Sequence, residues 1–572
     1  MRRLLGFKDF FPSETPKAKE YYASKIGKET IERTTSFFLS FLRHKGNPDI
    51  DQLLKEWFTF YSFRYYQSPY FVMVEAEYRR IKNFHPGEHH ALISTEALLD
   101  MFLWLKDKKE IPDSVSKDDV SVTLPFLELI LLFNDDVLNK YEKATKSVQH
   151  YTDSKKIQRL ILAGSFSQSD IINIDYAQIF YTQIYKKARL MSFIEKEEKY
   201  LPLLQQLLKE FQCESKEEFL KAFGSAVIIP LKTEGPSWSV LSLVNSADRE
   251  KSANILDNIA ISDDKLDNID QDDYLALRNK PFQKIADGEY RVIFELFLIK
   301  KLYNGLIFKL SSYDKNFLGK IRNDFSEGVL VYETLATILK SNNSIKFTGN
   351  FLKEEHKLER EPDYYYRENN EILLFESKDF FMPGKSKLSY DFTIIEAELM
   401  KDGRFKKAVT QLITNVIRTI KLELPDNLYN PTEVLIYPIV IVHDSLYSAP
   451  ALNYWVYYWF IEELETLKAD PELKEFNFMN IVPPTIIEID TLILYQQQFE
   501  TNELNLTALI RYYQSYVRFD LAGKLPPNLI EKHALQSAVS FSEFVRDYAH
   551  KQNIQINFES IIKMLKEEYN VN

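Results

Sequence analysis

The stretch that most constrains the fold is residues 361–378, which read EPDYYYRENNEILLFESK. An aromatic run from Tyr364 to Tyr366 and an apolar run from Ile372 to Phe375 flank two adjacent asparagines, Asn369 and Asn370. Asn tolerates positive φ better than other non-glycine residues, so this pair favours a two-residue turn. The pattern therefore predicts an antiparallel β-hairpin whose second strand is buried.

The turn fixes the register of this hairpin. If the two asparagines form the loop, Glu368 faces Glu371, and Asp363 lies opposite Glu376 with Cβ atoms roughly 5 Å apart. Two carboxylates at that separation repel each other, and a divalent cation such as Mg²⁺ between them removes the conflict. Lys378 points to the same face as Glu376. In the alternative, a longer loop reverses the face of Asp363 and leaves a surface ribbon with solvated charges.

These residues resemble the motif of the PD-(D/E)xK nuclease superfamily, which has the restriction-endonuclease-like fold. Pro362-Asp363 matches the first half of the motif, and Glu376-Ser377-Lys378 matches the second. The resemblance implies hydrolysis of a phosphodiester with Mg²⁺ or Mn²⁺. The two acids would bind the metal, the carbonyl of Ser377 would add a ligand, and Lys378 would position or activate the attacking water.

The resemblance also implies polar residues from the helices on either side of the hairpin. A helix over residues 328–339 precedes it, and Glu333 in that helix is the candidate for a further metal ligand, with Glu327 as the reserve. A helix over residues 404–418 follows the hairpin and carries Gln411, similar to a glutamine often seen there. The alternative for Glu333 is an ordinary solvated charge on a helix.

Basic residues gather after the hairpin and form the candidate phosphate-binding surface. Together with Gln411, the candidates for contact with nucleic acid are Lys385, Lys387, Lys401, Arg404, Lys406, Lys407 and Arg418. Charged runs on helices are more often only solvated faces, and that interpretation stays open for this group.

The composition limits the class of protein. A net charge of −11 over 572 residues argues against a surface that binds nucleic acid everywhere, and leaves room for a local basic groove. The single cysteine, Cys213, excludes an internal disulfide and fits a reducing compartment. No apolar run reaches the roughly 20 residues of a bilayer helix, and the start lacks the apolar core of a signal peptide. We expect a cytoplasmic protein without membrane contact.

The expected fold class is mixed α and β, in four parts. Residues 1–262 form a helical N-terminal region that regulates the protein or mediates a homo-oligomer or a partner complex, and residues 263–316 form an acidic linker, a hairpin and a helix. Residues 317–495 form the nuclease-like domain, for which the resemblance implies a restriction-endonuclease-like α/β/α core with a mixed sheet. Residues 496–572 form a helical tail. The apolar run at 433–442 predicts a core strand covered on both faces.

The function expected from the resemblance is that of a metal-dependent nuclease, specifically a DNA endonuclease. A large helical extension on such a core is typical of bacterial anti-phage and restriction systems, which is an analogy of architecture and not of chemistry. Two alternatives stay open. The chain can cleave RNA, or it can be a non-catalytic scaffold that binds nucleic acid or a protein partner through a nuclease-like fold.

Overall fold

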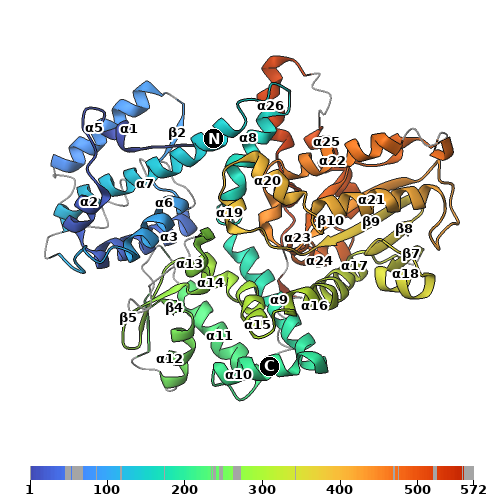
Figure 1. Ribbon diagram of the computed structural model, residues 1–572, viewed down its shortest axis with the longest axis horizontal. Coiled ribbons are helices and arrows are strands. Elements are labelled where there is room, and N and C mark those ends of the chain that lie inside the picture. The colour runs from blue at the N-terminus through green and yellow to red at the C-terminus, as the bar shows by residue number, and fades with distance from the viewer. Residues whose placement is uncertain are drawn as a thin grey trace. The chain divides into compact units, whose positions relative to one another are not determined.

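The computed structural model has mixed α and β structure, as predicted (Figure 1). It describes residues 2–45, 53, 69–85, 87–115, 119–172, 174–232, 235, 240–243, 249–261, 272–341, 343–467, 471–473, 476–519, 525–556 and 558–559. The chain forms two compact units. Unit 1 comprises Met1–Glu142, Ile171–Tyr176 and Pro202–Leu306, and unit 2 comprises Lys143–Asp170, Ala177–Leu201 and Ile307–Asn572.

Unit 1 is mainly helical. Its helices, wholly or for the larger part, are α1 (Phe7–Phe10), α2 (Lys19–Ile26), α3 (Lys28–Lys45), α5 (Pro69–Phe84), α6 (Thr95–Lys106), α7 (Asp119–Ser147), α10 (Leu201–Glu210), α11 (Lys216–Leu231), α12 (Arg249–Asn258), η5 (Asp272–Tyr274), α13 (Leu275–Asn279) and α14 (Glu295–Lys300). The strands β1 (Arg2–Leu4) and β2 (His89–Ala91) pair in parallel.

A second sheet in unit 1 has the order β3-β6-β5-β4. Its strands are β3 (Val240–Ser242), β4 (Ala260–Ile261), β5 (Phe282–Ala286) and β6 (Glu289–Val292). The predicted hairpin of residues 263–316 is therefore present as β5 and β6, and Gly288 takes φ +74° in its turn. The acidic stretch of the predicted linker, residues 263–271, lies outside the described residues.

Unit 2 is built on a five-stranded mixed sheet of order β11-β10-β9-β8-β7. The strands are β7 (Ser344–Thr348), β8 (Tyr364–Glu368), β9 (Glu371–Lys378), β10 (Leu435–Val442) and β11 (Thr485–Glu488). Strands β9, β10 and β11 run parallel, whereas β7, β8 and β9 are antiparallel. Tyr364 pairs with Phe375 and Glu368 with Glu371, so the predicted register of the hairpin is confirmed. Asn369 takes φ +52° in the turn.

Helices cover both faces of this sheet (Figure 1). Leu373 and Phe375 of β9 point into a core shared with the helices α17 (Tyr332–Ile338), α23 (Ile489–Leu494), α24 (Gln496–Glu500), α25 (Leu506–Val517) and α27 (Phe541–Lys551). Alternate residues of a strand point to opposite faces of the sheet, so Glu376 and Lys378 point away from this core. On their face of the sheet, α21 (Phe405–Ile420) packs on β9 and β10. Residues 436–442 of β10 are buried throughout, as predicted for a strand covered on both sides.

The remaining helices of unit 2 surround this sheet. They are α8 (Lys156–Ser165), η2 (Phe166–Gln168), α9 (Tyr176–Lys196), η3 (Glu198–Tyr200), α15 (Asn304–Tyr313), α16 (Phe317–Ile321), η6 (Arg322–Val331), α17 (Tyr332–Ile338), α18 (Gly349–His356), α19 (Gly384–Lys387), α20 (Phe392–Leu399), η7 (Ser445–Ser448), α22 (Leu452–Leu467), η8 (Pro471–Leu473), η9 (Phe478–Asn480), α23 (Ile489–Leu494), α24 (Gln496–Glu500), α25 (Leu506–Val517), α26 (Pro527–Ser537) and α27 (Phe541–Lys551). Within the described residues, no helix is both long enough and apolar enough to span a bilayer.

The compact units follow different boundaries from the predicted ones at 262 and 495. Lys186 of α9 forms a buried ion pair with Asp490 at 2.7 Å, and Asp170 forms another with Lys387 at 2.8 Å. These contacts join residues 143–170 and 177–201, predicted as part of the N-terminal region, to helices α19 and α23 of unit 2. The predicted tail is also part of this unit, because α25 and α27 contribute buried side chains to the sheet core.

Candidate active site

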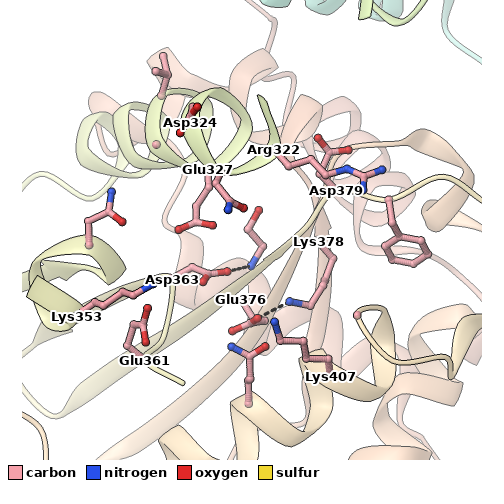
Figure 2. Close-up of a pocket in the computed structure, with 18 of the residues that line it drawn as sticks. Arg322, Asp324, Glu327, Lys353, Glu361, Asp363, Glu376, Lys378, Asp379 and Lys407 are labelled. Carbon is pink, nitrogen blue, oxygen red and sulfur yellow. Dashed lines mark hydrogen bonds and ion pairs between the residues drawn. The ribbon is translucent and has the colours of Figure 1, made fainter. Parts of the chain in front are cut away.

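A cavity of about 680 Å³ opens over the end of the hairpin, and all the residues that line it belong to unit 2 (Figure 2). Strand β9 supplies Glu376, Ser377 and Lys378, and Asp363 comes from the residue before β8. The structure thus brings the four residues of the predicted motif together in one cavity. Further walls come from η6, α18, α21 and the end of α9.

The motif residues contact one another directly. Asp363 Oδ2 accepts a hydrogen bond from the backbone N–H of Ser377 at 2.6 Å, and Lys378 Nζ forms an ion pair with Glu376 Oε1. Glu376 is only 1% exposed, and its other oxygen, Oε2, has no hydrogen-bond partner among the described residues. A buried carboxylate oxygen left unpaired costs about 1–3 kcal/mol or more, so this atom is suited to an additional ligand.

A third carboxylate comes from η6, which is a π-helix. Glu327 in this helix lines the cavity, and Tyr332 Oη donates a hydrogen bond to Glu327 Oε1 at 2.8 Å. Glu333, the first choice from the sequence, instead lies outside the cavity, is 54% exposed and pairs with Arg189. The structure therefore favours the reserve residue, because i→i+5 hydrogen bonding changes which helix positions face the sheet.

Electrostatics in the cavity oppose ionisation of all three acids. Burial and then the charge of Asp363 raise the pKa of Glu327 to about 7. Burial and Asp363 also hold the pKa of Glu376 well above its ordinary value, against the opposing effect of Lys378. Burial raises the pKa of Asp363, although Lys378 and the Ser377 N–H lower it. Lys378 stays charged, since Glu376 and Asp363 outweigh the effect of burial and raise its pKa.

The donor set fits a hard divalent cation. Carboxylate oxygens are the ligands that Mg²⁺ and Mn²⁺ prefer, and the unpaired Oε2 of Glu376 and the repulsion between Glu376 and Asp363 are both relieved by positive charge. Among the described residues, no group of three or more acidic, histidine or cysteine side chains already forms a metal-binding cluster. The fit therefore rests on the pair Asp363 and Glu376, with Glu327 nearby and the Ser377 carbonyl on the same strand.

Two of the predicted nucleic-acid contacts line the cavity. Lys407 and Gln411 lie one turn apart on α21, and the charge of Lys407 lowers the pKa of both Asp363 and Glu376. Gln411 is 8% exposed, and its Oε1 has no hydrogen-bond partner among the described residues. Both side chains therefore belong to the cavity lining.

The other predicted basic contacts lie outside the cavity. Lys385 and Lys406 are exposed. Lys401 and Arg404 pair with Glu398, and Lys387 is buried against Asp170. Arg418 donates hydrogen bonds to the backbone oxygens of Glu359 and Arg360 at 2.6 and 3.0 Å. Lys387, Arg404 and Arg418 thus each bind protein oxygens, which gives all three a structural role.

Sequence reasoning missed several residues of the site, and three of them lie close to the motif or add positive charge to the cavity. Lys353 on α18 and Arg322 on η6 line the cavity, and His443 Nε2 lies 2.9 Å from Ser377 Oγ. His443 directly follows the apolar run of β10, and a polar residue at the carboxyl end of a parallel strand is a recognisable signal for a site. No comparable signal marks Lys353, because the strand and helix that place it were not predicted.

Comparison of the chain with protein-family models, with curated proteins and with solved structures finds no match. What the cavity can do is therefore inferred from its own groups. Two facing carboxylates can hold a divalent ion, the ammonium of Lys378 can stabilise negative charge beside it, and Gln411 can accept a hydrogen bond from water.

Proposed function

We propose that this chain is a metal-dependent nuclease of the PD-(D/E)xK type, which hydrolyses phosphodiester bonds with Mg²⁺ or Mn²⁺. The observation that carries the proposal is the placement of Asp363 and Glu376 on one face of a hairpin end, with Lys378 against them and Glu376 Oε2 buried without a partner. The five-stranded mixed sheet with helices on both faces supports a restriction-endonuclease-like core.

The residues have separate roles in the proposed reaction. A bound divalent ion supplies a more acidic water and neutralises charge on the phosphate. Asp363, oriented by the Ser377 N–H, and Glu376 would hold the ion. The Lys378 ammonium stabilises the negative charge that develops on the phosphoryl oxygens as the water oxygen bonds to phosphorus and the P–O bond to the leaving oxygen breaks. The attacking water releases a proton to solvent, and the leaving oxygen takes one up from solvent. The carboxamide oxygen of Gln411 accepts a hydrogen bond from the attacking water.

Within this proposal, the favoured activity is that of a DNA endonuclease in a bacterial defence system, located in the cytoplasm. This proposal is supported by architecture: a mainly helical unit of more than 200 residues is joined to the proposed nuclease unit. The support is an analogy with bacterial defence proteins and not an argument from chemistry. Cleavage of RNA and binding without cleavage are the competing functions, and the assay below separates them.

The test is cleavage by the purified full-length protein. Supercoiled plasmid, linear double-stranded DNA, single-stranded DNA and RNA are each incubated with Mg²⁺, with Mn²⁺ or with EDTA, and the products are resolved by electrophoresis. We expect cleavage only with a divalent ion. Asp363→Asn should reduce it roughly 10³-fold, since a metal contributes several kcal/mol to transition-state stabilisation.

Glu333→Gln is the matched control, because it removes a carboxylate of the same unit that lies outside the cavity. It should cleave like the wild type. Cleavage in EDTA, or full activity of Asp363→Asn, would contradict the proposed site. Binding of nucleic acid by the wild type with no cleavage in either metal would instead support the scaffold function.

A further inference from the structure

Two lysines of the cavity, Lys353 and Lys407, lie beside the proposed metal site and form no ion pair with a described residue. The lining also carries an acidic wall, formed by Glu197, Asp324 and Glu327. From this combination we infer that the substrate is a single polynucleotide strand and not a duplex. This inference rests on the proposed nuclease function, for which single-stranded nucleic acid is the substrate class. The contact is with the sugar-phosphate backbone and bases of one strand, which DNA and RNA share.

The first observation is the small number of cations available to phosphates. Five basic side chains line the cavity, but Lys378 pairs with Glu376, and Lys199 pairs with Asp324 at 2.7 Å. Of the other three, Arg322 is only partly exposed and its guanidinium stacks over the Phe381 ring at 5.7 Å. Lys353 and Lys407 are exposed and form no ion pair with a described residue. Two such contacts suit one strand, whereas proteins that bind duplexes with strong salt dependence make roughly 6–10 phosphate contacts.

These two lysines lie on different sides of the carboxylates. Figure 2 shows Lys353 beside Asp363 and Lys407 beside Glu376, on α18 and α21 respectively. A strand that contacts both lysines therefore passes over the two acids proposed to hold the metal. This path places one phosphate at the ion and its neighbours at the lysines.

The second observation is the charge of the remaining lining. Seven acidic and five basic side chains line the cavity, a formal charge of −2 that one divalent ion cancels. Figure 2 shows the η6 acids Asp324 and Glu327 across the cavity from Lys407. Glu197 is a further carboxylate of the lining, and Lys199 balances one of these three charges. A second strand laid along this side would bring its phosphates against like charge.

The acidic wall is fixed in place by several contacts. Tyr200 Oη donates a hydrogen bond to Asp324 Oδ2 at 2.6 Å, and Lys199 pairs with the same oxygen. Phe193 packs on Phe325 and on Tyr200, with ring centroids 5.6 and 5.8 Å apart. The end of α9 is thereby held against η6, and these contacts keep the acidic side chains in position.

The third observation is the size of the cavity. At about 680 Å³ it lies within the roughly 300–1,000 Å³ of pockets that enclose a drug-sized molecule. One or two nucleotides of a strand fit this space. A B-form duplex, whose major groove alone is about 12 Å wide, does not enter it.

The test compares binding and cleavage for matched substrates with full-length protein. A labelled single strand, the same strand annealed to its complement, and RNA versions of both are titrated by fluorescence anisotropy with Ca²⁺ and then cleaved with Mn²⁺. We expect binding and kcat/KM for the single strand to exceed those for the duplex at least tenfold. The DNA and RNA arms show which sugar the site accepts.

Variants identify the surface responsible. Lys407→Ala and Lys353→Ala should each weaken single-strand binding and lower the slope of log K against log salt by about 0.7, the value for one phosphate contact on a single strand. Lys346→Ala, an exposed lysine of β7 outside the cavity, should change neither quantity. Glu197→Gln should improve duplex binding.

The outcomes separate the two proposals. Equal or tighter duplex binding, or an unchanged salt slope in both lysine variants, overturns the single-strand inference whether or not cleavage occurs. A single-strand preference that depends on the two lysines, with no cleavage in Mn²⁺, supports this inference and overturns the proposed hydrolysis.

Discussion

Replacing Glu327 by glutamine should make the metal-free protein more stable at alkaline pH. The carboxylate of Glu327 is desolvated and lies near Asp363, and both effects oppose its ionisation. An amide of the same shape removes the charge, and it can still accept the hydrogen bond from Tyr332 Oη. The change therefore isolates the electrostatic cost of a third carboxylate in an empty site.

The size of the effect follows from the pKa of Glu327. Burial and Asp363 raise this pKa from 4.5 to about 7. At 1.36 kcal/mol for each pH unit, ionisation in the folded state costs roughly 3 kcal/mol more than in the unfolded state. Below pH 4.5 the group is protonated in both states and costs nothing. Stability is lost as pH rises from 4.5 to about 7, and the full loss persists above it.

The assay is thermal unfolding of wild type and Glu327→Gln in EDTA at pH 5 and pH 8. The variant should unfold roughly 5 °C higher at pH 8, at about 2 °C per kcal/mol for a unit of this size, and the two proteins should be nearly equal at pH 5. Mn²⁺ should narrow the gap at pH 8, because the ion stabilises the wild-type carboxylates. Glu333→Gln, an exposed acid outside the cavity, is the control and should show no such pH dependence. An identical difference at both pH values would refute the reasoning.

Three further outcomes are expected. Lys378→Met should reduce the cleavage rate roughly 10²–10³-fold, since the ammonium acts on the transition state. Calorimetry should still show that the variant binds Mn²⁺, and loss of metal binding would contradict this division of roles. Asp426→Asn should destabilise unit 2 by roughly 3–5 kcal/mol, because it leaves the guanidinium of Arg367 without its buried carboxylate partner. Thermal unfolding measures this loss, and an unchanged melting temperature would show that the pair contributes little. Lys387→Ala should lower the stability of unit 2 without changing the salt dependence of nucleic-acid binding, because Lys387 is buried against Asp170. A reduced salt slope would instead show that Lys387 contacts phosphate.

The hairpin was predictable because its information is local. The asparagine pair favours positive φ, which Asn369 adopts, and the alternation along β9 fixes which side chains share a face. Once the turn is known, the opposition of Asp363 and Glu376 follows by counting. The strand at 435–442 was equally clear, because an apolar run of that length is typical of a strand covered on both faces.

The unit boundaries were not predictable from composition. Lys186 and Asp490 meet as a buried pair although about 300 residues separate them, and nothing in either local sequence marks the contact. Helices α8 and α9 therefore read as part of the N-terminal region, whereas they pack within unit 2. Buried ion pairs of this kind depend on tertiary geometry, since each charge is acceptable only where its partner is already placed.

The choice of the helix acid failed for a different reason. The apolar-flanked pattern Tyr332-Glu333-Thr334-Leu335-Ala336 favoured Glu333, but the chain forms a π-helix over Arg322–Val331, and Glu327 faces the cavity. Some of the basic residues after the hairpin were also misjudged, because local sequence does not show tertiary partners. Lys387, Arg404 and Arg418 look like phosphate contacts in the sequence because their protein partners become apparent only in the folded chain.

The central claim is that a divalent ion lies between Asp363 and Glu376, and anomalous scattering from crystals grown with Mn²⁺ tests it most directly. We predict one strong anomalous peak roughly 2 Å from carboxylate oxygens of both residues. Crystals of Asp363→Asn grown in the same way should show the peak weakened or missing. Wild-type crystals in saturating Mn²⁺ with no peak in the cavity, or with the ion bound elsewhere in the chain, would contradict the claim.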